Sequence, residues 1–224
     1  MLELYLDSAD LVGIKNLCPA LPLAGVTTNP SILAASGIGL QELLPALIDS
    51  IGPQARFHVQ VLSDSVEGII AEAHKLHELP FDIIVKIPAH TAGLTAIKQL
   101  KKQNIPLLAT AIYNVQQGML AALNGADYLA PYLNRIDNQG FDGIAVVGEL
   151  QNLIDRYRLP GKLLVASFKN VNQVLQVLKL GVGAVTLPLD IAQQFLTTPS
   201  TDAATEKFND DWQAAFAGKL SFES

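Results

Sequence analysis

The sequence has little of what disulfide-rich, membrane-spanning or nucleic-acid-binding proteins require. Cys18 is the only cysteine among 224 residues, so no internal disulfide is possible and the chain suits a reducing compartment. No apolar window reaches the roughly 18 residues of a membrane span, and the N-terminus opens on acidic residues, MLELYLDSAD, rather than on a basic region. The net charge is −6 and there is no basic cluster, which argues against nucleic acid and anionic membranes as partners. We therefore expect a cytoplasmic protein.

Linkers and nucleotide-binding fingerprints are also missing. Glycine and proline are spread along the chain, and with half its residues apolar the chain can build one substantial core. No GxGxxG pattern follows the first apolar run, which argues against an open, doubly wound sheet. His74 and His77 have no carboxylate placed to complete a metal site. We expect residues 1–224 to form a single domain without a metal.

What the chain does contain is a regular alternation of two patterns. Short apolar runs occur at 2–6, 23–28, 56–62, 82–88, 106–112, 127–133, 162–168 and 183–189. Between them, apolar residues recur at helical spacing. Eight strand candidates, each followed by a helix candidate, predict parallel β/α units, and eight is the number that closes a barrel. We predict an α/β fold, a single (β/α)8 TIM barrel with an additional C-terminal helix at about 203–216. Phe208, Trp212 and Phe216 give that helix an apolar stripe.

The run Asp82–Pro88, DIIVKIP, places a lysine inside an apolar strand of the kind that is covered on both faces. Burial costs an ammonium group its hydration, so Lys86 must reach water, pair with a carboxylate such as Asp7, or give up its proton. A neutral amine is a nucleophile for carbonyl carbon. The pattern alone leaves a structural lysine and a catalytic lysine equally open.

Polar residues end most of the apolar runs. A single one means little, since Thr27 or Thr110 could bond to the backbone and Asp7 could cap the next helix. In a barrel, however, catalytic residues come from the carboxyl ends of several strands, so we expect these side chains to converge on one pocket. The strand-end residues are Asp7, Thr27, Thr28, Asn29, Gln60, Lys86, Thr110, Tyr132, Asn134, Arg135 and Ser167.

Several segments resemble the transaldolase family over nearly the whole length. They are LDSAD at 6–10, GVTTNPSI at 25–32, VKIP at 85–88, TAIYNVQQG at 110–118, APYLNRID at 130–137, ASFKN at 166–170, VTLPLD at 185–190 and the terminal DWQAAF. The likeness is strongest to the small subfamily that includes the bacterial fructose-6-phosphate aldolases. It implies a (β/α)8 barrel that uses a lysine Schiff base and neither metal nor cofactor.

The resemblance also assigns catalytic roles. It implies that Lys86 forms the imine and that Asp7 hydrogen-bonds sugar hydroxyls and assists proton transfer. Gln60 and Thr110 are expected to hold the water that moves protons while the imine forms and hydrolyses. Tyr132 is the expected acid–base group.

Substrate binding is assigned by the same likeness. Asn29 and Ser167, with Thr27 in the same set, are expected to bind the donor ketone. Arg135 with Ser167 is expected to bind the phosphate, for which a planar and permanently charged guanidinium is well suited.

Two positions separate the members of this family. Transaldolases proper resemble one another in having Glu where this chain has Gln60 and Phe where it has Tyr132. The pair found here is the aldolase pattern, and it predicts cleavage or formation of the C3–C4 bond of fructose 6-phosphate, with dihydroxyacetone and glyceraldehyde 3-phosphate as products. His58 departs from that pattern, and it faces the same side of its strand as Gln60, which leaves the donor preference open.

Other functions stay open at this point. They are a transaldolase that moves the same three-carbon unit between sugar phosphates, a pyridoxal-phosphate barrel, and a catalytically silent sugar-phosphate-binding protein. The resemblance also implies a ring-like homo-oligomer, of which a decamer is one size, with the helix at 203–216 reaching a neighbouring subunit.

Overall fold

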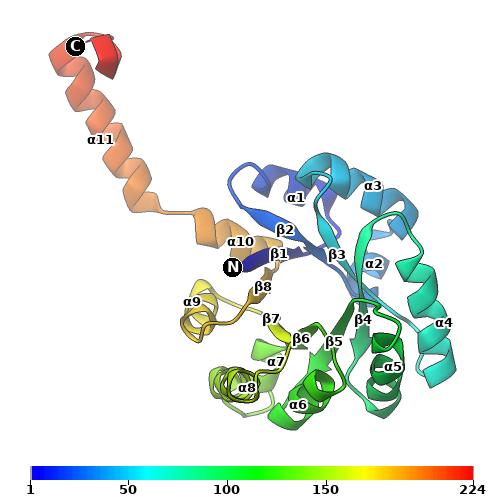
Figure 1. The fold of residues 1–224 in the computed structure, drawn as a ribbon. Helices are drawn as coiled ribbons and strands as arrows, with labels where there is room; N and C mark the ends of the chain where they lie inside the picture. Colours follow the sequence, from blue (N-terminus) through cyan, green and yellow to red (C-terminus); the bar gives the residue numbers. More distant parts are fainter. Residues whose placement is uncertain (1, 224) are drawn as a thin grey trace.

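The computed structural model describes residues 2–223 and contains a closed barrel of eight parallel strands (Figure 1). The strands are β1 (Glu3–Asp7), β2 (Leu23–Thr27), β3 (Arg56–Gln60), β4 (Asp82–Pro88), β5 (Leu107–Ile112), β6 (Tyr128–Pro131), β7 (Lys162–Val165) and β8 (Ala184–Leu187). They follow one another in sequence order around the barrel, and β8 pairs with β1 to close it. The predicted (β/α)8 barrel is thus confirmed.

Helices surround the barrel and connect its strands. They are α1 (Leu11–Leu17), α2 (Pro30–Ser36), α3 (Leu40–Ile51), α4 (Val66–His77), α5 (Thr91–Lys101), α6 (Val115–Leu123), α7 (Leu133–Asp137), α8 (Gly143–Tyr157), α9 (Val171–Lys179), α10 (Leu189–Leu196), α11 (Pro199–Phe216) and the 3-10 turn η1 (Ser221–Glu223). The short helices α2 and α7 were not predicted, and each follows the carboxyl end of a strand. Among residues 2–223 no single helix is long and apolar enough to span a membrane, although the bent pair α2 and α3 has the length and composition.

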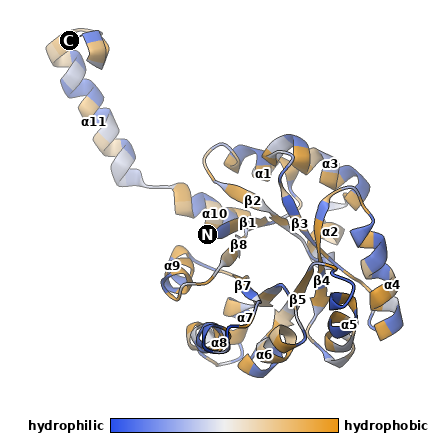
Figure 2. Ribbon diagram, viewed as in Figure 1, coloured by the Kyte–Doolittle hydropathy of each residue, from blue (hydrophilic) through white to orange (hydrophobic). Residues whose placement is uncertain are grey.

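The strands separate two apolar cores because successive side chains point to opposite faces. In β4, Val85 and Ile87 pack outward against the helices, whereas Ile84 and Lys86 lie on the inner face. The inner core is small and contains Tyr5, Ile84, Leu108, Tyr128, Ala130, Tyr132, Leu164, Ala166 and Ala184. Figure 2 shows the strands largely in the hydrophobic colour and the helices two-toned, as this layering requires.

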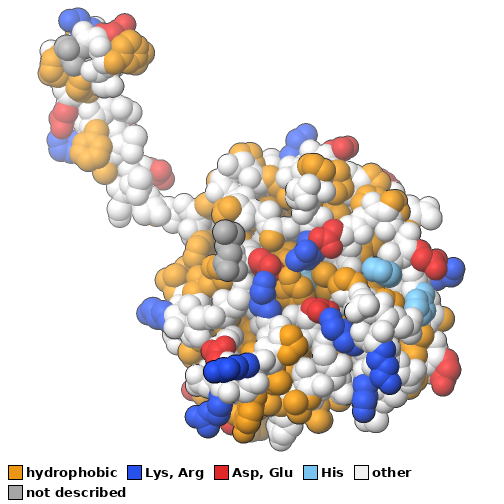
Figure 3. All heavy atoms as spheres, in the orientation of Figure 1, with side chains coloured by type: hydrophobic (Ala, Val, Ile, Leu, Met, Phe, Trp, Pro, Cys, Tyr) orange, Lys and Arg blue, Asp and Glu red, His pale blue; other side chains and the backbone are white. Residues whose placement is uncertain are grey.

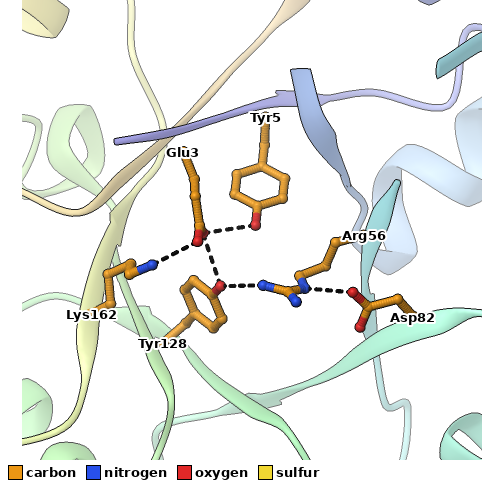
Figure 4. Close-up of polar contacts among 6 residues, drawn as sticks. All are labelled: Glu3, Tyr5, Arg56, Asp82, Tyr128 and Lys162. Atoms are coloured by element: carbon orange, nitrogen blue, oxygen red, sulfur yellow. Dashed lines mark hydrogen bonds and ion pairs between the residues drawn. The ribbon is translucent and has the colours of Figure 1, made fainter. Parts of the chain in front are cut away.

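The amino ends of the strands are closed by a polar network (Figure 4). The Glu3 carboxylate accepts hydrogen bonds from Tyr128 at 2.8 Å and from Lys162 at 2.6 Å, and Arg56 donates to the Tyr128 hydroxyl at 2.8 Å. Burial raises the pKa of Glu3, but the bonds from Lys162, Tyr128 and Tyr5 outweigh it, so the pKa lies below its ordinary value. Acidic and basic side chains lie beside one another over this part of the barrel in Figure 3. A pocket for chemistry is therefore expected at the other end.

The C-terminal helix α11 extends away from the barrel (Figure 1), and none of its residues is buried. It begins at Pro199, a few residues earlier than predicted, since proline suits the first turn of a helix. The Trp212 and Phe216 rings lie 4.4 Å apart, and Trp212 Nε1 donates to the Lys219 carbonyl at 2.7 Å, which folds the end of the chain back on the helix. Phe208 is 68% exposed. The predicted apolar stripe is therefore free of the barrel.

Candidate active site

A cavity of about 160 Å³ lies at the carboxyl ends of the strands. It is lined by Asp7, Asn29, Lys86, Tyr132, Arg135, Ala166, Ser167, Phe168, Lys169 and Pro188. Larger hollows lie elsewhere on the described surface, among them two of about 530 and 520 Å³ near α8 and near Pro80 and two of about 460 and 360 Å³, and none of the predicted site residues lines them. We take the smaller cavity as the site because it is more enclosed and gathers side chains from many strand ends.

Lys86 reaches this cavity from the inner face of β4 and is only 4% exposed. Its Nζ donates to the backbone carbonyl of Thr28 at 3.0 Å. Within residues 2–223 it forms no ion pair, so the alternative in which Asp7 neutralises a structural lysine is not observed. The amine is thus held by one neutral acceptor at the cavity, in the position that attack on a carbonyl carbon requires.

Asp7 ends β1 and lines the cavity, whereas its neighbour Thr27 ends β2 and does not. The two residues are paired in register, and Thr27 Oγ1 donates to Asp7 Oδ1 at 2.7 Å. Thr27, predicted as a binding residue, therefore contacts the carboxylate in this structure rather than the cavity. Among the residues described, Asp7 Oδ2 has no hydrogen-bond partner.

Tyr132 follows β6 and lies at the centre of a second polar group. Its hydroxyl is 2.9 Å from Thr110 Oγ1, so these two predicted residues are brought together. The Arg135 guanidinium lies 4.8 Å from the Tyr132 ring centroid, and Nη1 donates to the Tyr113 hydroxyl at 3.4 Å. That hydrogen bond is the main cause that raises the pKa of Arg135. The side chain therefore keeps its charge while it lines the cavity.

Local backbone geometry fixes two of the binding residues. Asn29 caps α2, with Oδ1 accepting from the Ile32 amide at 3.0 Å, so its amide nitrogen is the group left to meet a ligand. Ser167 has φ 67°, in the left-handed region that non-glycine residues seldom adopt. The amide of Asn134 holds it there by donating to the Ser167 carbonyl at 2.9 Å. Strained backbone conformations of this kind persist where the surrounding structure holds them, and they are concentrated at functional sites.

Gln60 and His58 lie on the same side of β3 at different depths. Gln60 is paired in register with Lys86, and within residues 2–223 its side chain has no hydrogen-bond partner. His58 is fully buried one layer deeper, with its ring edge-on to Tyr5 at 4.8 Å and to Tyr128 at 5.0 Å. It does not line the cavity.

Lys169 and Tyr113 are functional candidates that the sequence analysis missed. Lys169 lines the cavity with Arg135 and adds a second cation to it. The signal was present in the ASFKN segment, where Lys169 follows Ser167 by two residues. Tyr113 follows β5 directly, and its contact with Arg135 depends on the irregular pairing of β5 with β6 near Ala111, which has φ 55°. No sequence pattern indicated that irregularity.

Fold and site together define a (β/α)8 barrel with an amine, a carboxylate, a phenol and cations around one cavity. A family model described as Transaldolase/Fructose-6-phosphate aldolase matches residues 4–223. The chain therefore belongs to this family.

Solved structures with a similar fold include variants of flavocytochrome b2. A double variant with sulfite bound has a TM-score of 0.60 at 12% identity, covering 84% of this chain and 56% of the other. A double variant with pyruvate bound has a TM-score of 0.61 at 13% identity, with the same coverage. A single variant with benzoylformate has a TM-score of 0.59 at 12% identity, covering 84% of this chain and 57% of the other. The chain thus spans little more than half the length of these proteins, and at such identity the likeness shows the barrel alone.

Proposed function

We propose that this protein is a class I aldolase that cleaves and forms the C3–C4 bond of fructose 6-phosphate, with dihydroxyacetone and glyceraldehyde 3-phosphate as products. The observation that carries the proposal is the placement of Lys86, a buried amine without a charged partner, at a cavity that Tyr132 and Arg135 also line. Membership of the family is the second support.

In the proposed mechanism the Lys86 amine attacks the C2 carbonyl, and loss of water gives a protonated imine. Asp7 then takes the proton of the C4 hydroxyl, the C3–C4 bond breaks, and its electron pair moves into the imine to give an enamine. Glyceraldehyde 3-phosphate leaves. A proton added to C3 restores the imine, and water hydrolyses it to dihydroxyacetone and the free amine. Atoms and electrons balance without any external oxidant or metal.

The proton transfers are assigned to groups at the carboxyl ends of the strands. The paired hydroxyls of Tyr132 and Thr110 are the proposed acid–base set for C3, because a phenol can both donate and accept a proton. Asp7 is proposed to accept hydrogen bonds from the sugar hydroxyls through Oδ2. Gln60, in register with Lys86, is proposed to hold the water of imine hydrolysis.

The phosphate is proposed to bind at the cationic side of the cavity. Arg135 supplies a bidentate fork, Lys169 adds a point charge, and Ser167 adds a hydroxyl. Asn29 is proposed to bind the hydroxyl at the opposite, dihydroxyacetone end through its free amide nitrogen.

Transaldolase activity is the second candidate, because the matched family contains both activities. Both use the same imine and differ in the fate of the enamine, which is protonated in an aldolase and captured by an aldose in a transaldolase. Product analysis on fructose 6-phosphate alone decides between them. Free dihydroxyacetone is the expected result, and transfer to an added aldose phosphate without its release would refute the aldolase proposal.

The imine itself is tested by borohydride reduction in the presence of dihydroxyacetone. We expect a mass increase on the peptide that contains Lys86 and none in the Lys86→Met variant. Labelling at Lys98 or Lys169 instead would refute the assignment of the nucleophile.

We also propose a cytoplasmic location and a ring-like homo-oligomer. The first rests on the single cysteine. The second rests on α11, whose exposed aromatic side chains extend away from the barrel and are suited to contact a neighbouring subunit (Figure 1).

A further inference from the structure

Thr186 in β8 is a buried hydroxyl that no role described above uses. Its side chain is 2% exposed, and its Oγ1 lies 2.7 Å from Thr27 Oγ1. Thr27 Oγ1 in turn lies 2.7 Å from Asp7 Oδ1. Three side chains from the adjacent strands β8, β2 and β1 therefore form one continuous chain of short hydrogen bonds that ends on the carboxylate at the cavity.

The donor and the acceptor of each of these hydrogen bonds follow from counting the protons on the hydroxyl groups. A threonine hydroxyl has one proton to donate and two lone pairs to accept with. Thr27 donates its proton to Asp7, so it can only accept from Thr186. The bonds therefore run from Thr186 to Thr27 to Asp7, and each donor is polarised by the next acceptor, which strengthens both bonds.

The register places Thr186 beneath the other two residues. Thr27 is paired with Asp7 at the same level, whereas Thr186 is paired with Tyr5, one inward-facing position closer to the amino end of β1. A hydroxyl rotates freely unless a partner holds it, and Thr186 is the partner that leaves Thr27 one direction in which to donate. Asp7 Oδ1 is thereby occupied, and Oδ2, without a hydrogen-bond partner among the described residues, is left for the ligand.

We propose that Thr186 is a positioning residue, whose hydroxyl orients Asp7 toward the substrate through Thr27. The proposal rests on the proposed function, in which Asp7 binds the sugar hydroxyls. It goes beyond that function because Thr186 does not line the cavity and its side chain is hydrogen-bonded to Thr27, not to Asp7.

Two substitutions separate the hydroxyl from the packing. Thr186→Val keeps the β-branched shape but removes the donor, and Thr186→Ser keeps the donor but removes a methyl group. If the hydroxyl acts as proposed, Thr186→Val lowers kcat/KM for fructose 6-phosphate by about tenfold, the size of one hydrogen bond. Thr186→Ser should keep most of the activity. Equal losses in both variants would overturn the proposal, as would wild-type activity in Thr186→Val.

A double-mutant cycle with Thr27→Val then tests the hydrogen-bond relay, that is, the two bonds that run from Thr186 to Thr27 to Asp7. Once Thr27 has lost its hydroxyl, Thr186 has nothing to orient, so Thr186→Val should cost little further activity in that background. Independent losses that multiply would show that Thr186 acts only by packing, and would overturn the proposal.

The same double-mutant cycle can be measured on the free energy of unfolding, which tests the relay independently of catalysis. Coupling between positions 27 and 186 is expected there, and its absence would overturn the proposal. If wild type forms no borohydride-trapped imine, the proposed aldolase function fails, but the unfolding cycle still decides whether the relay exists.

Discussion

The first prediction concerns His58, and it tests whether the interior of the barrel holds this imidazole buried and neutral. Its imidazole is fully buried, and within residues 2–223 neither ring nitrogen has a hydrogen-bond partner. Burial is the main cause that lowers the pKa of His58 well below 6.5, and the charges of Lys86 and Arg56 lower it further. The perturbation we propose is His58→Phe, which keeps an aromatic ring between Tyr5 and Tyr128 and removes the titrating group.

The sign of the effect follows from proton linkage. Below pH 6.5 the unfolded chain binds a proton at His58 that the folded protein does not, so the free energy of unfolding falls as the pH falls. Well below pH 6.5 this one group changes the free energy of unfolding by about 1.4 kcal/mol per pH unit. Above pH 6.5 the stability that His58 contributes is fully present. Between pH 7 and pH 5 wild type should therefore lose about 2 kcal/mol that His58→Phe keeps.

A second effect should be visible at neutral pH. Removing an unpartnered buried polar group relieves a desolvation penalty of about 1–3 kcal/mol, so the variant should be at least as stable as wild type at pH 7. His58→Leu would not serve, because it also removes the edge-on ring contacts.

The assay is urea unfolding at pH 7, 6 and 5, followed by far-UV circular dichroism at one protein concentration. His77→Gln is the control, since His77 is exposed on α4 and its loss leaves no cavity. If wild type and His58→Phe lose stability equally between pH 7 and pH 5, the imidazole is not buried in its neutral form and the reasoning fails.

Three further predictions concern the site and the C-terminus. Tyr132→Phe should lower ketose-phosphate cleavage by about 10²–10⁴, the usual effect of one acid–base group, while transfer to an aldose acceptor suffers less; equal losses in both rates would contradict the role. Arg135→Ala should raise KM for phosphorylated substrates at least ~tenfold, since a charge-assisted hydrogen bond contributes roughly 1.5–3 kcal/mol. Unphosphorylated aldehydes are its control, and the same loss for both would make Arg135 structural. Deleting residues 203–224 should reduce the particle mass in light scattering, because α11 then offers no aromatic stripe to a neighbour; an unchanged mass would exclude that contact.

The barrel was predictable because its signals are local. The continuous apolar run of β4 indicated a strand that is covered on both faces, and the structure places Lys86 on the inner face, 4% exposed. The predicted runs at 127–133 and 162–168 overextended their strands, because the chain stays buried after the strand ends, at Leu133 and Phe168 for example. A buried residue beyond the end of a strand is as apolar as a residue inside the strand. The sequence therefore shows where the chain is buried, and only the structure shows where strand pairing ends.

Contacts between strands were much harder to predict. The sequence indicated that Thr110 and Tyr132 share a rim, but not that their hydroxyls meet at 2.9 Å. The same applies to Thr186, which reads as an ordinary strand threonine. Its contact with Thr27 depends on the stagger of β8 and β2 against β1, a property of the closed barrel and of no single segment.

The acceptor that holds Lys86 is the backbone carbonyl of Thr28, and it limits how mutation can move the amine. A side-chain acceptor can be lost in one mutation, whereas every amino acid at position 28 carries the same carbonyl. The position of the Lys86 amine therefore depends on the path of the chain after β2, and the cavity walls around it can be exchanged without removing its acceptor. If Lys86 is the nucleophile as proposed, engineering for new substrates can act on the cavity wall while the amine keeps its place.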